Sequence, residues 1–251
     1  MKKSLFYIIL AIAIVVGLTG CSKNTSSKDN GDNEKTEFQV FEADVIEAGD
    51  GLLVGPDKDS PEYSSADKIS VGLSDAGEIP ETLKPGDRIK IYYYGNIAES
   101  YPAKISASRI ELIGSNQIVD GIISLIDDIY HEDSGLNNSI TMMAFDTGKL
   151  EGLSDTEIEI ILAMAREEYG LEIVQGTFDE LAEQGLIDKE NLYFEKGILI
   201  EFKDVKIDRG KNKISCSISK WRSGLGAIGW DAKAELDGGE WIIKRDNIWI
   251  S

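Results

Sequence analysis

Histidine is almost absent from this sequence, which restricts the chemistry that the chain can perform. Its 251 residues include a single histidine. Zinc sites usually take several histidine or cysteine ligands, and a serine triad needs a histidine base. His131 lies four residues after Asp127 on the same helix face, which would allow a weak metal pair, but one histidine does not complete a zinc site. We expect it instead near a helix terminus, where an imidazolium interacts favourably with the helix dipole. The sequence therefore identifies no catalytic residue, no metal site and no cofactor.

Cysteine is also scarce, so a disulfide framework cannot be the basis of stability. The two cysteines are Cys21 and Cys216. In KISCSISKW, Cys216 alternates with serines in the same way as Ile214 and Ile218. This period of two is typical of a strand with the thiol on its inward face, where a free cysteine behaves as a small hydrophobic residue.

Basic residues are too few to balance the acidic ones. The chain has 26 lysines and arginines against 45 aspartates and glutamates, for a net charge of −19. Such a chain repels nucleic acid and anionic lipid surfaces. The acidic loop 55–67 is not a calcium loop either, because only Asp57 and Asp59 fit the spacing and Pro61 stands where the next ligand is needed. We interpret this loop as a solvated segment.

Long apolar runs are absent except near the N-terminus. Leu5–Val16 is uncharged and follows two lysines, which is the layout of a secretory signal, and it is shorter than the roughly 20 residues of a membrane-spanning helix. The four residues that end this segment resemble the lipobox of bacterial lipoproteins: Leu18, Thr19, Gly20 and Cys21. The resemblance implies cleavage before Cys21 and a diacylglyceryl group, with acyl chains such as palmitate, on its thiol.

The composition then divides the chain into four parts. We predict a lipoprotein signal peptide over residues 1–20, followed by a flexible tether over residues 21–36 that begins with the lipidated cysteine. The tether is polar and has no apolar side chain to bury after the cysteine. A barrel domain is expected over residues 37–114 and a second domain over residues 117–251.

The first domain consists of short alternating segments separated by turn residues. Five strands in about 75 residues, without a clear helical period, favour a small closed barrel, which has no exposed edges. The five segments are FQVFEADVIEA, LLVG, KISVGL, DRIKIYYY and AKISASRIELI.

FEADVIEAGDGLLV and LKPGDRIKIYYYGNIAESYPAKISASRIELI together resemble the YobA-like family of secreted and lipid-anchored proteins of Gram-positive bacteria. The resemblance covers residues 38–113. It implies an OB-like barrel and an extracytoplasmic location, and it implies no reaction. Some OB-like barrels bind single-stranded nucleic acid in a basic groove, but Arg88 and Lys90 alone do not supply one.

The second domain begins with helical periods and ends with strands. Capping boxes at Ser154–Glu157 and Thr177–Glu180 predict two helix starts, after a first helix with an apolar stripe from Ile118 to Ile129. Four strand-like segments follow Gly197 and end in GGEWIIKRDNIWIS, which is similar to cystatin-like and NTF2-like folds. The sequence thus predicts an α+β class overall: a small OB-like barrel, then an α+β domain with helices packed on a curved antiparallel sheet.

KWRSGLGAIGW, residues 220–230, combines glycines, an arginine and two tryptophans. A phosphate-binding glycine loop opens a helix, whereas strand-like sequence follows Gly226 here, so we predict a structural hairpin. Tryptophan and arginine are frequent anchors of protein interfaces. The alternative is therefore a contact surface formed by Trp221, Arg222 and Trp230.

Together these features predict a lipoprotein on the extracytoplasmic face of the cell membrane. We expect a non-catalytic binding or adaptor module that is held by its lipid anchor and contacts another envelope protein, with no nucleic-acid partner. Two alternatives remain open. One is an envelope hydrolase that uses paired carboxylates, and the other is a small-molecule carrier with a pocket in the second domain.

Overall fold

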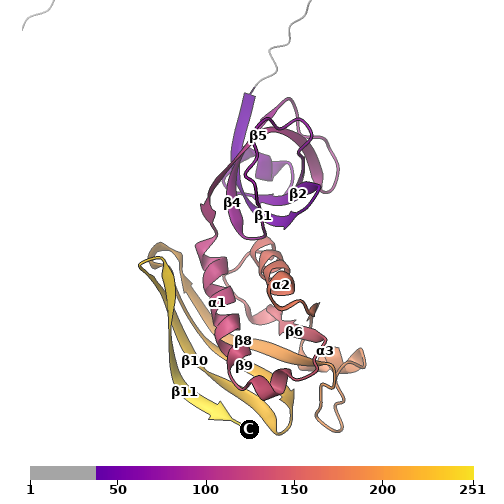
Figure 1. Ribbon diagram of the computed structural model, residues 1–251, viewed down its shortest axis with the longest axis vertical. Helices are drawn as coiled ribbons and strands as arrows, with labels where there is room; N and C mark the ends of the chain where they lie inside the picture. The colour runs from indigo at the N-terminus through magenta and orange to yellow at the C-terminus, as the bar shows by residue number, and fades with distance from the viewer. Residues whose placement is uncertain (1–37) are drawn as a thin grey trace, which may run out of the picture. The chain divides into compact units, whose positions relative to one another are not determined.

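The computed structural model describes residues 38–251, drawn in colour in Figure 1. The predicted signal peptide, the tether and Cys21 lie outside these residues. Within the described part, no helix is both long enough and apolar enough to cross a membrane. The barrel and the sheet that follows it belong to one compact unit, Thr36–Ser251.

The first part of the described chain is a closed five-stranded barrel, as predicted. Its strand order is β1-β2-β3-β5-β4, with β1 pairing back onto β4 and with β3 and β5 parallel. This arrangement is compatible with an OB-like fold. The strands are β1 (Phe38–Ala48), β2 (Gly51–Pro56), β3 (Ile69–Gly72), β4 (Asp87–Tyr94) and β5 (Ala103–Ser115).

Alternation along the strands fills the barrel. In β4, Ile89, Ile91 and Tyr93 are almost completely buried, while the residues between them are more accessible. Tyr93 carries a hydroxyl into this core, where it donates to Gln39 Oε1 and lies 3.1 Å from Glu62 Oε1. The alternation of apolar and polar residues in β4 therefore predicts which side chains face the inside of the barrel and which face outward.

The second part combines one sheet with three α-helices. The sheet has the order β11-β10-β9-β8-β6-β7; β8 to β11 are antiparallel, whereas β6 runs parallel to both β7 and β8. The helices are α1 (Gln117–His131), α2 (Asp155–Tyr169) and α3 (Phe178–Glu183). The strands are β6 (Met142–Asp146), β7 (Glu172–Gln175), β8 (Gly197–Asp208), β9 (Lys213–Ser223), β10 (Gly226–Asp237) and β11 (Glu240–Ile250).

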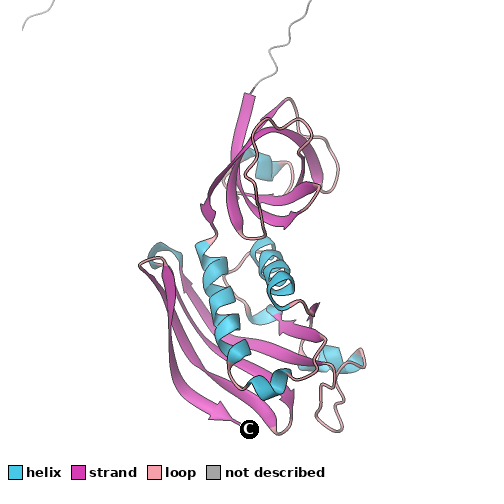
Figure 2. Ribbon diagram, viewed as in Figure 1, coloured by secondary structure: helices cyan, strands magenta, loops and turns pink. Residues whose placement is uncertain are grey.

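The predicted α+β class is wrong. The structure is mostly β, with 47% strand and 23% helix, and the described residues contain only three α-helices (Figure 2). The expected cystatin-like or NTF2-like domain, with helices packed on an antiparallel sheet, is therefore replaced by a mixed sheet with few helices. One reason is β6, whose five residues are all buried and so show no alternation that distinguishes a strand from a helix.

The core of the second part joins α1 to the sheet. The stripe predicted from the sequence is buried along α1, and it shares one apolar cluster with Ile214, Ile218 and Trp230 of β9 and β10. Figure 1 shows α1 running along these strands. The predicted capping boxes at Ser154–Glu157 and Thr177–Glu180 are confirmed at the starts of α2 and α3.

Lys220 of β9 is fully buried and binds the end of α1. Its ammonium group lies 2.9 Å from the carbonyl oxygen of Tyr130, donates also to that of Glu132, and is 3.2 Å from Asn137 Oδ1. The last carbonyls of a helix have no partner within the helix. Burial lowers the pKa of Lys220 to about 8, against the opposing charges of Asp133 and Glu132. The side chain therefore fastens the sheet to the C-terminus of α1.

We expect Lys220→Met to lower the free energy of unfolding by about 2–4 kcal/mol, because the carbonyl oxygens at the end of α1 lose a charged donor. Urea denaturation measures the change. Lys213→Met is the matched control, since Lys213 lies on the same strand with a half-exposed side chain paired to Glu235. Equal stability losses in the two variants would contradict this account of Lys220.

Candidate functional site

The predicted contact residues lie at one end of β9 and β10 but do not form a single surface. Trp230 is 1% exposed and belongs to the core, with the guanidinium of Arg245 4.2 Å from its ring centre. Trp221 is half-buried and packs edge-on against Phe178, with 5.1 Å between ring centres. Only Trp221 and Arg222 therefore stay near the surface, and their role in contacting a partner remains a prediction.

Arg222 holds two loops together. Its Nη1 donates to the carbonyl oxygens of Leu136 at 2.8 Å and Asn138 at 2.7 Å, and its Nη2 donates to that of Glu195 at 3.2 Å. The guanidinium also lies over the ring of Tyr193. These three bonds use part of the five N–H donors of the guanidinium, so Arg222 shapes this end of the sheet.

The glycine-rich stretch is a hairpin, as predicted. β9 and β10 pair in antiparallel register on both sides of it, with an irregularity between Gly226 and Ala227. No helix begins after the glycines, so their amides do not form a phosphate-binding helix terminus. Leu225 stands at the tip and is 92% exposed.

Leu225 is one of several exposed apolar side chains at this end of the sheet, which we call the hairpin-end surface. The loop that precedes β8 reaches the hairpin through a bond from the amide of Gly224 to the carbonyl oxygen of Leu192. The end of β11 reaches it through the pairing of Ile228 with Ile250. The members of the surface are Leu192, Tyr193, Leu225, Ile248, Trp249 and Ile250. Because successive strand residues point to opposite sides, Trp249 and Ile250 lie on opposite faces of β11, so the surface wraps around this end of the sheet.

A second candidate site is a polar cavity of about 680 Å³ lined by the barrel and by the start of α2. We call it the polar cavity. Its lining includes five acidic and three basic residues, together with the half-buried Tyr63 and Thr156. The charged members are Asp44, Asp57, Asp67, Asp155, Glu157, Lys58, Arg88 and Arg209.

Arg88 organises the barrel side of the polar cavity. Its two terminal nitrogens bind both carboxylate oxygens of Asp57, at 2.9 and 2.5 Å, and Nη1 also donates to Asp44 Oδ1 at 3.2 Å. Such bidentate pairs fix geometry as well as charge. Asp57, considered above as a possible calcium ligand, is thus an arginine partner. Among the described residues, no group of three or more acidic, histidine or cysteine side chains is placed to hold a metal ion.

Asn116 connects β1 of the barrel to the first turns of α1 and α2. Its Nδ2 donates to Asp44 Oδ2 at 2.7 Å and lies 3.4 Å from Glu157 Oε1, while its Oδ1 accepts from the amide of Val119 and caps α1. Arg209 binds both oxygens of Glu157, at 2.8 and 2.9 Å. The polar cavity therefore lies beside one continuous network of paired charges.

The two buried carboxylates of this network shift in opposite directions. Burial raises the pKa of Asp44, although Asn116 and Arg88 act against it. Burial would also raise the pKa of Glu157, but Arg209 and Ser154 outweigh it and hold the pKa below its ordinary value. Separated pKa values are typical of acid–base pairs. Here, however, all four carboxylate oxygens already accept hydrogen bonds from the protein, which supports a structural role.

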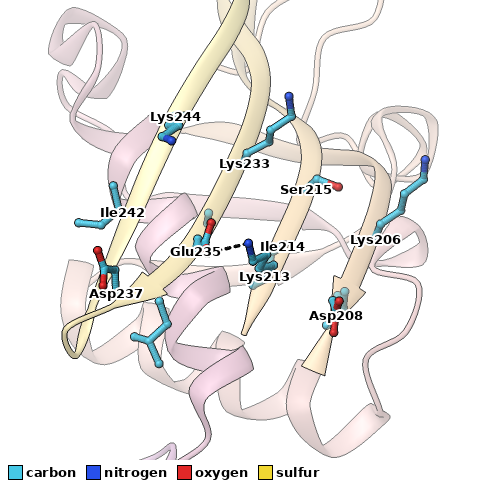
Figure 3. A pocket seen from close by; sticks show the side chains of 13 residues that line it. Lys206, Asp208, Lys213, Ile214, Ser215, Lys233, Glu235, Asp237, Ile242 and Lys244 are labelled. Atoms are coloured by element: carbon cyan, nitrogen blue, oxygen red, sulfur yellow. Dashed lines mark ion pairs between the residues drawn. The ribbon is translucent and has the colours of Figure 1, made fainter. Parts of the chain in front are cut away.

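A third hollow, of about 660 Å³, lies on the solvent side of β8 to β11 (Figure 3). Its labelled side chains carry charges of both signs: Lys213 pairs with Glu235 at 2.6 Å, while Lys233 and Lys244 stand opposite each other in the neighbouring row. Lysines and acidic residues are usual on the exposed side of a sheet. This hollow lies in the second domain, where a carrier pocket was considered, and, like the polar cavity, it is open to solvent rather than enclosed.

His131 and Cys216 have structural surroundings. His131 ends α1, is exposed, and its Nδ1 lies 3.1 Å from Asp127 Oδ1, as expected for a helix terminus. Cys216 faces the core as predicted, and burial raises the pKa of its thiol to about 12, which keeps it unreactive at neutral pH.

The residues of the polar cavity were not recognised in the sequence as a site. The capping motif at Ser154–Glu157 was visible, but nothing in it indicates that Glu157 also binds Arg209, which is 52 positions away. Asp44, Arg88 and Asn116 are equally separated along the chain. The one feature visible in the sequence was that Asn116 directly precedes a helical pattern. This position predicts a helix N-cap, but it does not predict that Asn116 also binds Asp44.

One family model matches the barrel part of the chain. Residues 23–114 match the family model described as "Protein of unknown function (DUF3221)". The match spans the barrel, ends within β5 and does not cover the second sheet. No curated protein matched the chain. The comparison thus supports the barrel as a recurring unit and assigns it no activity.

The network predicts a pH-dependent contribution of Glu157 to stability. The pKa of Glu157 is lower in the folded chain than its ordinary 4.5, so the contribution is complete above that value and is lost as the pH falls through the folded pKa. We expect Glu157→Gln to lower the free energy of unfolding by about 1–3 kcal/mol at pH 7. The difference from wild type should shrink below about pH 4.5, as measured by urea denaturation.

Glu180→Gln is the matched control, because Glu180 forms the same capping box in α3 but is exposed and has no arginine partner among the described residues. It should change stability less than Glu157→Gln. A Glu157→Gln deficit that stays constant from pH 7 to pH 3.5 would contradict the assignment.

Proposed function

We propose that this protein is a lipoprotein anchored on the extracytoplasmic face of the cell membrane, where it acts as a non-catalytic adaptor that binds another envelope protein. The observation that carries the proposal is the hairpin-end surface, a group of six exposed apolar side chains on a strongly acidic chain. Exposed apolar groups of this kind mark interaction sites on soluble surfaces.

The charges around the hairpin-end surface favour a protein partner over a lipid surface. Leu192 and Tyr193 lie in the loop 188–196, which holds three acidic residues and two lysines and so has a net charge of −1 (2 − 3). Together with the net charge of −19 on the whole chain, this repels anionic lipid headgroups. A partner surface with apolar side chains surrounded by basic residues would complement the apolar side chains and the acidic charge of this surface. Complementary charges at the edge of an interface raise the association rate.

The lipid anchor is supported by the sequence from Leu18 to Cys21 and by a polar segment after it that suits a tether. Two or more acyl chains give stable membrane attachment. The anchor would confine this protein to the membrane surface. If the partner is also in the envelope, confinement raises the effective concentration of one protein near the other.

The anchoring step has a direct test. We expect Cys21→Ala to abolish incorporation of a clickable palmitate analogue into the full chain in producing cells, because the thiol is the acceptor. Cys216→Ala is the control and should leave labelling unchanged, since this thiol is buried. Acyl labelling that persists in Cys21→Ala would refute the lipobox assignment.

The adaptor surface is tested by photo-crosslinking in intact cells. A benzophenone side chain at position 225 should capture one dominant envelope protein, because this position is the most exposed apolar point of the hairpin. The same probe at position 213, on the solvent side of the sheet, serves as the control site. Captured proteins are identified by mass spectrometry.

Introducing negative charge into the hairpin-end surface should reduce the crosslink formed by the probe at position 225. We expect Tyr193→Asp with Ile250→Asp to reduce the capture at position 225 at least fivefold, since burying two charges against an apolar partner is unfavourable. Thermal unfolding checks that the variant remains folded. Equal capture at positions 225 and 213, or capture that is unaffected by the two aspartates, would count against the proposal.

A further inference from the structure

The polar cavity is a separate feature from the hairpin-end surface, and the adaptor proposal gives it no role. Its volume of about 680 Å³ falls within the range of small-molecule sites. Its walls come from β1, β2 and β4 of the barrel and from the segment that leads into α2. Gly55 fixes their approach, because a Cβ atom there would lie 2.4 Å from Thr156 Cγ2.

Five of the eight charged groups in the wall are held by one another: Asp44, Asp57, Glu157, Arg88 and Arg209. Arg88 is bound to Asp44 and Asp57, and Arg209 is bound to Glu157 through two parallel bonds. A site whose polar atoms are already oriented loses little freedom when a ligand binds. The paired groups of this network therefore present donors and acceptors at fixed positions.

The lining disfavours anions and offers no metal site among the described residues. Five acidic residues outnumber three basic ones in the lining, so phosphate and carboxylate ligands meet net repulsion. The arginines are paired to carboxylates, and no set of ligands for a metal ion exists among the described residues. An apolar ligand would desolvate these charges without replacing their hydration.

The remaining groups suit hydroxyls. Tyr63, Thr156 and Asp155 line the polar cavity, and within the described part of the chain none of their side chains has a hydrogen bond to the protein. Each hydroxyl of a ligand both donates and accepts, and so satisfies such mixed neighbours. The ring of Tyr63 adds an apolar face beside its polar tip, as sugar rings require.

We propose that the polar cavity is a binding site for a neutral oligosaccharide, with Tyr63, Thr156 and Asp155 as direct contacts. The network of Arg88, Asn116 and Arg209 positions the walls. This role is non-catalytic, because the buried carboxylates are already occupied by protein donors.

The test is calorimetric titration of the full chain in detergent micelles with the trisaccharides chitotriose, cellotriose and maltotriose. We expect at least one to bind with a Kd between about 10 µM and 1 mM. Tyr63→Phe and Thr156→Val should each weaken this binding about threefold to tenfold, the effect of one lost hydrogen bond. Both changes preserve side-chain volume, and thermal unfolding confirms that each variant is folded.

Tyr193→Phe is the matched control. It makes the same chemical change on the hairpin-end surface and should leave binding unchanged, so the two proposals fail independently. The inference is overturned if no trisaccharide binds, if inorganic phosphate or calcium binds more tightly, or if Tyr63→Phe and Thr156→Val bind as wild type does.

Discussion

A buried charge must have a partner, and much of this structure follows from that constraint. Asp44 lies in the first strand of the barrel and Glu157 in the first turn of α2, and both are nearly inaccessible to water. Neither is stable there as an isolated carboxylate. Arg88, Asn116 and Arg209 neutralise or bind them, and so hold the barrel, the starts of two helices and the end of β8 in one arrangement.

The same constraint explains why the most conspicuous residues of the sequence are structural. Lys220 satisfies the carbonyls at the end of α1, and Arg222 satisfies those of two neighbouring loops. With Trp230 in the core, little of the KWRSGLGAIGW stretch remains for recognition except its tip. The candidate surfaces lie beside these residues: apolar side chains around Leu225, and the polar cavity beside the paired arginines.

Prediction succeeded where a pattern is local. The alternation in β4 and the stripe along α1 each repeat within a few residues and report which side is buried. It failed for the class of the second part, because β6 is uniformly buried and enters the sheet between distant segments. Parallel pairing of β6 with β7 and β8 depends on contacts that no local period encodes.

The sequence by itself determined the scarcity of histidine, the acidic balance, the barrel strands and the helix starts at Ser154 and Thr177, since composition and short-range spacing express them directly. Tertiary structure alone decided which charges meet. Asn116 reaches Asp44 across 72 positions of sequence, and Arg209 reaches Glu157 across 52. Side chains that far apart in sequence are brought together only by the packing of whole strands and helices, and both candidate surfaces result from that packing.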